Sequence, residues 1–200
     1  MIKAWRFYKL DIFVTMQTAS RELMGQTAMN HTIRRLAFEL LENHNRFADT
    51  VLIGLQPRGI YLAGRLASLL TSETGNPRIP LGYLDITFHR DDFRTRTLIP
   101  SYTQIDFLIE NKKVVLIDDV LYTGRTIRAG LDALLAFGRP AEVELLVLVD
   151  RRYSRHLPIQ PDYVGTVTDT ITSDKVKVNW KESEGFDSVQ LMTSSNFESR

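Results

Sequence analysis

The hydrophobic and polar positions of the chain follow two alternating periodicities. Apolar residues from Ile33 to Leu41 recur every three or four positions, which predicts an amphipathic helix with Asn30 as its cap. The β-branched run 50–54 predicts a buried strand, and the apolar spacing from Ile60 to Leu70 predicts a second helix. Residues 81–88 predict another strand. The first half of the chain therefore reads as alternating helices and strands.

The second half continues this alternation. Four consecutive apolar residues, 114–117, predict a buried strand, an amphipathic stretch follows through Phe137, and Val143 to Val149 predicts the next strand. Because strands that alternate with helices need right-handed crossovers, we expect an α/β fold with a mostly parallel, twisted sheet flanked by helices. Three C-terminal segments predict a small strand-rich part that pairs antiparallel: Tyr163 to Val167, Lys175 to Trp180 and Ser188 to Met192.

The N-terminal residues differ from the rest of the chain. Residues 1–25 mix basic and aromatic side chains and contain neither an uninterrupted apolar segment nor a cleavage pattern, so no signal peptide is expected. We treat them as a peripheral extension of unknown role. Residues 26–200 have a suitable length for a single domain with its own core.

Composition narrows the classes of function. The formal net charge is +1, so no global basic field indicates a nucleic-acid partner. The absence of cysteine excludes disulfides, thiolate metal sites and a cysteine nucleophile, and favours a cytoplasmic location. No apolar stretch approaches membrane-spanning length, so no membrane partner is expected. The four histidines lack metal-ligand spacing and are predicted to lie at the surface: His31, His44, His89 and His156.

The segment from Val114 to Thr126 carries the strongest chemical pattern. Its strand ends in Asp118 and Asp119, and the turn 123–126 opens the next helix. Open α/β sheets bind ligands at the carboxyl ends of their strands. The N–H groups, hydroxyls and helix N-terminus of the turn suit a phosphate dianion. The carboxylates repel phosphate and suit hydroxyl groups or a Mg²⁺ that the substrate carries. Together these features describe a site for a ribose 5-phosphate.

This segment also resembles the signature of the type I phosphoribosyltransferases, which use phosphoribosyl pyrophosphate (PRPP). The run IDDVLYTGRTIRAGLDAL, followed by FGRP and LVLVDRR, is similar to the family of bifunctional pyrimidine-operon regulators and uracil phosphoribosyltransferases. The resemblance extends from about Ile33 to Met192 and implies a type I phosphoribosyltransferase fold with a flexible hood loop. It implies that Asp118 and Asp119 serve the ribose hydroxyls, one of them directly, because neighbouring strand residues point to opposite sides. The 5-phosphate would be held by Thr123, Gly124, Arg125 and Thr126, although helix capping also explains the two threonines.

Two more motifs acquire roles from the resemblance. The sequence GLQPRG at 54–59 follows a strand and would form a pyrophosphate loop in which Arg58 and Gly59 contact the ligand, although a simple strand-to-helix turn explains it equally well. Residues 88–92 would begin the hood, which closes over PRPP and excludes water, with Arg90 contacting the pyrophosphate. A solvated charged loop is the alternative there. The predicted catalytic residues are Asp118, Asp119, Arg58 and Arg90.

Three residues bear on the identity of the base. Purine-using relatives place a carboxylate where this chain has Tyr122 and a lysine where it has Asp150, so the resemblance favours uracil over hypoxanthine or guanine. It implies that Tyr163 stacks on the base, that the backbone of Val164 reads its edge, and that Asp150 lies beside it. A strand tyrosine otherwise packs in a core.

The implied reaction converts uracil and PRPP to UMP and pyrophosphate. The resemblance implies a substrate-borne Mg²⁺, which Asp118 or Asp119 would contact, and no organic cofactor. Orotate, hypoxanthine and guanine stay open as alternative bases.

The resemblance also implies a second class of function. Members of the family bind the leader RNA of the pyrimidine operon in response to UMP or UTP, and a homo-oligomer, a dimer or larger, is expected. At Phe38 and Thr166 the chain departs from the histidine and lysine that the family favours, so catalysis is ranked above an RNA-binding attenuator with little catalysis. The basic groups that would face RNA phosphates are Arg34, Arg35, Arg151, Arg152, Arg155 and His156.

Overall fold

The computed structural model describes residues 18–45, 47–76, 79–90, 101–170 and 174–194. Residues 1–17 of the predicted extension and residues 91–100 of the predicted hood lie outside these ranges. Within the described ranges, no helix has the length and apolar character needed to cross a membrane.

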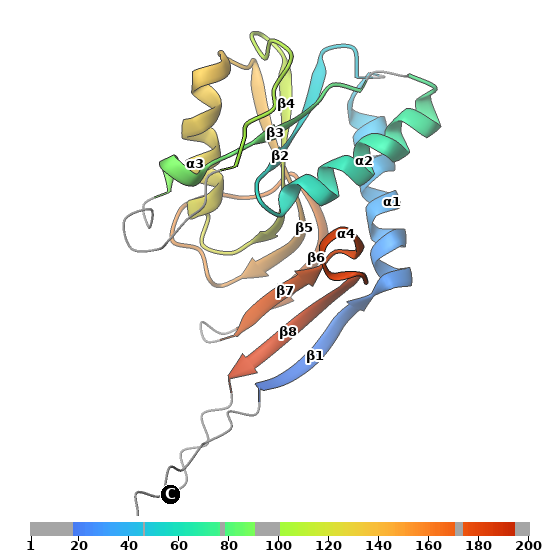
Figure 1. Cartoon of the computed structure of the whole chain (residues 1–200), viewed down its shortest axis with the longest axis vertical. Helices are drawn as coiled ribbons and strands as arrows, with labels where there is room; N and C mark the ends of the chain where they lie inside the picture. The colour runs from blue at the N-terminus through green and yellow to red at the C-terminus, as the bar shows by residue number, and fades with distance from the viewer. Residues whose placement is uncertain (1–17, 46, 77–78, 91–100, 171–173, 195–200) are drawn as a thin grey trace, which may run out of the picture.

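A five-stranded parallel sheet forms the centre of the molecule, in the order β3-β2-β4-β5-β6 (Figure 1). Every residue of β2 and residues 114–119 of β4 are buried, as expected when both faces of a parallel sheet are covered. This arrangement confirms the predicted α/β class. The strands are β2 (Thr50–Leu55), β3 (Leu81–Leu84), β4 (Lys113–Leu121), β5 (Glu142–Arg152) and β6 (Tyr163–Asp169).

Strand β6 corrects the prediction of antiparallel pairing, because it lies parallel to β5. Asp162 fixes its starting point. The Asp162 carboxylate accepts the N–H of Leu145 at 2.7 Å, and the Asp162 N–H donates to the Leu145 carbonyl at 2.8 Å. The loop from Tyr153 to Asp162 therefore carries the chain back along β5 before β6 begins.

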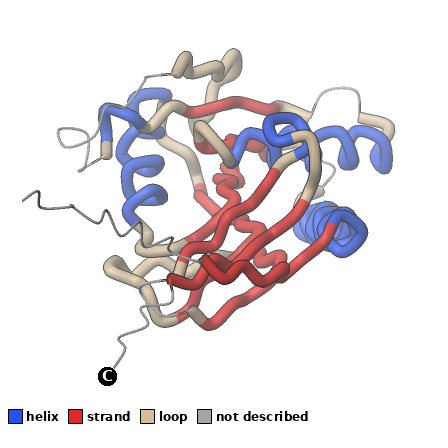
Figure 2. Tube along the Cα trace, turned by 60° about the horizontal axis from the view of Figure 1, so that its bottom comes forward, coloured by secondary structure: helices blue, strands red, loops and turns tan. Residues whose placement is uncertain are grey.

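Helices cover both faces of the sheet (Figure 2). Helix α1 (Gln26–Asn43) and helix α2 (Gly59–Thr74) bury their apolar faces against one side of the sheet, and α3 (Arg125–Leu134) packs on the other. Helix α1 starts at Gln26, so the predicted cap Asn30 lies inside it. A 3₁₀ turn, η2 (Leu135–Phe137), extends α3 to the predicted end.

Strand β3 is shorter than the predicted strand 81–88. It ends at Leu84, and a 3₁₀ turn, η1 (Thr87–His89), follows. The cause is Asp85, whose carboxylate accepts the N–H of Thr87 at 3.0 Å and its hydroxyl at 2.6 Å, and the N–H of Ser101 at 3.0 Å. An aspartate that satisfies the backbone two residues later favours a turn over a continuing strand.

A second, antiparallel sheet has the order β1-β8-β7 and lies below the central sheet in Figure 1. It contains β1 (Thr18–Gly25), β7 (Lys175–Asn179) and β8 (Ser188–Ser194), and the short helix α4 (Lys181–Glu184) connects β7 to β8. The antiparallel pairing of the last two strands confirms the prediction. Strand β1 pairs along β8, so residues 18–25 belong to this sheet, which corrects their assignment to a peripheral extension.

His44 lies in a buried polar cluster at the amino-terminal end of the central sheet, and its exposed fraction is 2%. Its Nδ1 lies 3.1 Å from the Thr50 hydroxyl, and its Nε2 lies 3.1 Å from a Glu144 carboxylate oxygen. The Tyr163 hydroxyl donates to Glu144 at 2.8 Å. Burial lowers the pKa of His44, although Glu144 opposes the shift. The prediction that every histidine lies at the surface is therefore wrong for His44.

We expect Tyr163→Phe to lower the free energy of unfolding by about 1–3 kcal/mol, because Glu144 loses a donor in a buried environment. Urea-induced unfolding measures the change. Tyr102→Phe is the matched control: Tyr102 is 81% exposed, so we expect a change within about 0.5 kcal/mol. An equal effect of the two substitutions would contradict the structural role of the Tyr163 hydroxyl.

Candidate functional site

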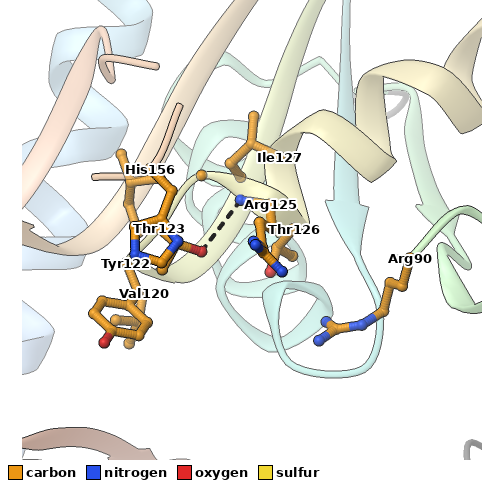
Figure 3. Close-up of a pocket in the computed structure, with 10 residues that line it drawn as sticks. Arg90, Val120, Tyr122, Thr123, Arg125, Thr126, Ile127 and His156 are labelled. Carbon is orange, nitrogen blue, oxygen red and sulfur yellow. Dashed lines mark hydrogen bonds between the residues drawn. The ribbon is translucent and has the colours of Figure 1, made fainter. Parts of the chain in front are cut away.

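A cavity of about 390 Å³ opens at the carboxyl end of β4. The end of that strand, the turn that follows it and the start of α3 supply most of its wall, as residues Val120 to Ile127 (Figure 3). Arg90 lies on one side of this wall and His156 on the other. The cavity thus occupies the edge of the sheet at which ligands bind in open α/β folds.

The turn between β4 and α3 has a tightly constrained backbone. Gly124 adopts a φ of 88°, in the left-handed region. A Cβ atom at this position would lie 3.2 Å from Ile159 Cδ1, so glycine satisfies both the dihedral angle and the available space. The N–H of Arg125, the first residue of α3, donates to the Thr123 hydroxyl at 3.4 Å, so this hydroxyl also serves the helix start. The first N–H groups of α3 and two threonine side chains therefore face one cavity, which suits an anion.

Asp118 and Asp119 lie immediately before this wall and are not among the residues that line the cavity. Strand β4 continues through both acids to Leu121, further than the predicted apolar run. Their exposed fractions are 6% and 8%. Burial raises the pKa of Asp118 well above its ordinary value, and the neighbouring Asp119 charge raises it further. Burial also raises the pKa of Asp119, with Arg58 opposing the shift.

Arg58 connects the predicted pyrophosphate loop to the second acid. Its Nε donates to Asp119 at 3.1 Å, and Nη1 donates to Glu184 at 3.2 Å. A third bond reaches the carbonyl of Val178. A Cβ on Gly59 would lie 2.3 Å from the carbonyl oxygen of Ile117, so the loop packs directly against β4. This close approach brings the guanidinium of Arg58 to the acidic pair.

The peptide bond that precedes Pro57 in this loop, Gln56–Pro57, is cis. Arg90, the other predicted pyrophosphate contact, follows η1 and lines the cavity. The remaining hood residues, 91–100, lie outside the described residues.

Comparison with known proteins places this geometry in a family. Residues 21–183 match the phosphoribosyl transferase domain. The chain is 46% identical to "Bifunctional protein PyrR" of Desulfosudis oleivorans, over 89% of this chain and 98% of that protein. It is 42% identical to the protein of the same name from Microcystis aeruginosa, over 86% and 96%. The chain belongs to the phosphoribosyltransferase family.

Solved structures agree on the fold. A hypoxanthine phosphoribosyltransferase of Trypanosoma cruzi matches with a TM-score of 0.64 and 15% identity, over 88% of this chain and 97% of that chain. One from Staphylococcus aureus matches with a TM-score of 0.63 and 18% identity, over 88% and 93%. The similarity to PyrR proteins confirms the resemblance to the bifunctional regulator group within the phosphoribosyltransferases.

The residues predicted to bind the base do not meet at the cavity of this phosphoribosyltransferase. Tyr163 is buried between α1 and the sheet, and its hydroxyl faces the opposite end of the sheet, so stacking on a base does not fit its position. The carbonyl of Val164 accepts from Arg35 Nη2 at 2.9 Å. Asp150 pairs with Arg155 and lines a neighbouring cavity of about 470 Å³, together with Tyr153 and residues 157–161.

The predicted RNA-binding arginines also separate. Arg151 is 3% exposed, lies over the Tyr122 ring at 3.9 Å, and donates to Thr170 Oγ1 at 2.9 Å. Arg155 donates to several backbone carbonyls. Arg151 is therefore internal, and Arg155, whose side chain is only partly exposed, is engaged with the backbone, so neither presents its guanidinium to an RNA surface.

The other three arginines of this set are exposed and ion-paired. Arg34 pairs with Glu73 at 3.3 Å, Arg152 with Asp169 at 2.9 Å, and Arg35 with Glu39.

His156, predicted from the sequence only as a basic group for RNA, lines the cavity, a position that the sequence pattern did not indicate. It lies in the loop after β5, and its N–H donates to the carbonyl of Thr123 at 3.0 Å. In a parallel sheet the loops that follow neighbouring strands meet at one edge, so adjacency of β4 and β5 was the signal that could have identified it.

We expect Asp118→Asn to stabilise the ligand-free protein while removing an acidic group of the site. The pKa of Asp118 is raised by folding, so its contribution to stability is fully present below the unfolded value of about 3.9 and is lost as pH rises through the folded pKa. Asparagine does not ionise and escapes this loss. The increase in Tm should therefore grow as pH rises from about 4 toward the raised pKa of Asp118, by about 2–4 °C for each kcal/mol. Thermal unfolding across this range measures it, and a Tm increase that is constant with pH would contradict the assignment.

Proposed function

We propose that the chain is a uracil phosphoribosyltransferase, which converts uracil and PRPP to UMP and pyrophosphate. The observation that carries this proposal is the adjacency of two unlike environments at one strand end. The turn from Thr123 to Thr126 supplies N–H and hydroxyl donors, and the buried acids Asp118 and Asp119 precede it by a few residues. A ribose 5-phosphate needs donors at its phosphate and acceptors at its two hydroxyls.

The pyrophosphate would leave on the side of Arg58 and Arg90. Charge develops on this group as its bond to the ribose breaks, so cationic donors stabilise the transition state more than the bound substrate. In the ligand-free protein the guanidinium of Arg58 is already engaged with Asp119 and Glu184. A hydrogen bond from Ser183 is the main cause that lowers the pKa of Glu184 to about 2, which keeps it charged. Substrate binding would therefore exchange partners around Arg58.

Mg²⁺ is proposed to arrive with the substrate. In the described part of the chain, no group of three or more histidine or acidic side chains is arranged to hold a metal ion. Asp118 and Asp119 offer carboxylate oxygens, the ligands that Mg²⁺ prefers, so one of them could complete a coordination shell that pyrophosphate and water supply. When bound, the ion would neutralise charge on the pyrophosphate.

The proposal of uracil as the base rests on Tyr122 and on the relatives. Tyr122 lines the cavity and its ring packs against Arg151, at the sequence position where purine-using relatives carry a carboxylate. The second cavity, which Asp150 lines, lies next to the first one, because Asp150 of β5 pairs with Leu121 of β4. We propose that the base extends toward this second cavity. The PyrR name of the relatives, at 40–46% identity, agrees with a pyrimidine.

In the presence of Mg²⁺, we expect PRPP to be consumed with uracil, and at least a hundredfold more slowly with orotate, hypoxanthine or guanine. Chromatography of UMP and release of pyrophosphate measure turnover. The double variant Asp118→Asn, Asp119→Asn should lose at least a hundredfold in kcat/KM. Turnover of hypoxanthine in the absence of uracil turnover would overturn the proposed base and leave the phosphoribosyltransferase family intact.

A second candidate function is binding of pyrimidine-operon leader RNA under the control of UMP or UTP. It is favoured by the word "Bifunctional" in the name shared by relatives that cover 86–89% of this chain. The exposed arginines of the predicted set, Arg34, Arg35 and Arg152, are the groups able to face phosphates. The burial of Arg151 and the backbone contacts of Arg155 leave these three as candidates.

If the chain binds leader RNA, the logarithm of the affinity should fall linearly with the logarithm of salt concentration. Combining Arg34→Gln and Arg152→Gln should reduce the slope by about one for each RNA phosphate that the variant no longer neutralises. Filter binding with UMP present measures it, and Arg139→Gln, at another exposed arginine, is the control. Absent binding, or equal slopes for all variants, would remove this function from these residues.

A further inference from the structure

The loop between β5 and β6, residues 153–162, lies directly behind the turn that lines the cavity. The N–H groups of His156 and Leu157 both donate to the carbonyl of Thr123, at 3.0 and 3.2 Å. Leu157 and Ile159 also occupy the space beside Gly124, where a Cβ would meet them at 3.4 and 3.2 Å. Hydrogen bonds and packing from a segment about thirty residues later in the chain therefore hold the turn in place.

Arg155 is the centre of this support. Its guanidinium donates to the carbonyls of Leu121 and Ile159 at 3.2 and 3.1 Å, and to that of Arg151 at 3.3 Å. A further bond reaches the carbonyl of Tyr122. One planar side chain with five N–H donors thus joins the end of β4, the end of β5 and the returning loop.

These carbonyls lie where the sheet no longer fixes the chain. The pairing of β4 with β5 ends at Leu121 opposite Asp150, so the peptide units that lead into Thr123 lack a neighbouring strand. Buried carbonyls require donors, and an arginine supplies several at once. Carbonyl groups alone would leave the positive charge of Arg155 without a counter-charge. Asp150 supplies this counter-charge by forming an ion pair with Arg155.

We propose that Arg155 is a positioning residue for the phosphate-binding turn. It contacts the backbone that enters the turn and orients the N–H groups of residues 123–126 toward the 5-phosphate. This inference rests on the part of the proposed function that places a ribose 5-phosphate at the turn, and it does not depend on which base is used. It replaces RNA contact as the role of Arg155, and it makes Asp150 the charge partner of that arginine.

Arg155→Lys tests the proposal, because lysine keeps the charge and loses the fork that spans several carbonyls. The probes are ribose 5-phosphate and pyrophosphate, each titrated calorimetrically into the full chain. We expect the affinity for ribose 5-phosphate to fall about tenfold in Arg155→Lys and further in Arg155→Gln, with pyrophosphate affinity within about twofold of the wild type. Arg128→Gln is the matched control: Arg128 is an exposed α3 arginine that pairs with Asp132, and it should bind both probes like the wild type.

Amide hydrogen exchange provides a second measurement on the ligand-free protein. The N–H of Leu157 bonds to Thr123, and the N–H of Arg128 bonds to Gly124 at 3.0 Å. Both should exchange faster in Arg155→Lys, while amides of β2 stay unchanged. If Arg155→Gln does not fold, the lysine variant and the exchange rates decide the question.

Three results would overturn the proposal. They are wild-type affinity for ribose 5-phosphate in a folded Arg155→Lys, an equal loss for both probes, or no binding of ribose 5-phosphate by the wild type. A different outcome is that uracil is not turned over, while Arg155→Lys still loses affinity for ribose 5-phosphate and not for pyrophosphate. That outcome would reject the proposed base and support the positioning role.

Discussion

The burial of two adjacent carboxylates at the end of β4 is the constraint on which the rest of the site depends. Removing an ionised carboxylate from water is costly, and a second one beside it adds repulsion. The chain offsets part of this cost locally, since Asp118 accepts the N–H of Asp119 at 2.9 Å. The remainder requires a cation from another element, and Arg58 supplies it to Asp119. The cost of burying these acids is therefore reduced when a ligand's hydroxyl groups or metal ion bind to them.

Arg58 also explains why the small antiparallel sheet belongs to the site. Its other two bonds reach Val178 and Glu184, at the end of β7 and in α4. About two turns further along α2, Arg65 pairs with Glu182 and Asp187, at 2.7 Å each, in the same region. The two arginines fix α2 to the C-terminal sheet, so the position of the Arg58 guanidinium depends on residues more than one hundred positions away. The C-terminal strands thus position the predicted pyrophosphate loop as well as completing the fold.

The sequence predicts what is local and misses what depends on distant contacts. The strand, the acids and the turn around Gly124 follow each other within a dozen residues, so their proximity was readable from the pattern alone. Tyr163 reads equally well as a stacking residue or a core residue, and only the packing of α1 against β6 decides between them. His44 looked solvated because it follows helix α1, and its partners Thr50 and Glu144 come from two separate strands. The direction of β6 follows from its parallel pairing with β5, which begins beside the two hydrogen bonds between Asp162 and Leu145 and which no local pattern reveals.

The arginines show the same limit of prediction from sequence, because their contacts with distant residues decide whether their charge faces solvent. A formal net charge of +1 suggests that few cations are available for a polyanion, but the count does not say which of them face solvent. Strands of unequal length at the carboxyl edge of a parallel sheet leave carbonyls without a partner strand, and arginine can satisfy several of these groups together. Arg155 is used in this way, whereas Arg151 donates to the carbonyl of Asp174 and the hydroxyl of Thr170. Basic residues just after a buried strand are therefore weak evidence for a nucleic-acid surface. The same residues, once placed, become evidence for how the backbone of the neighbouring turn is held.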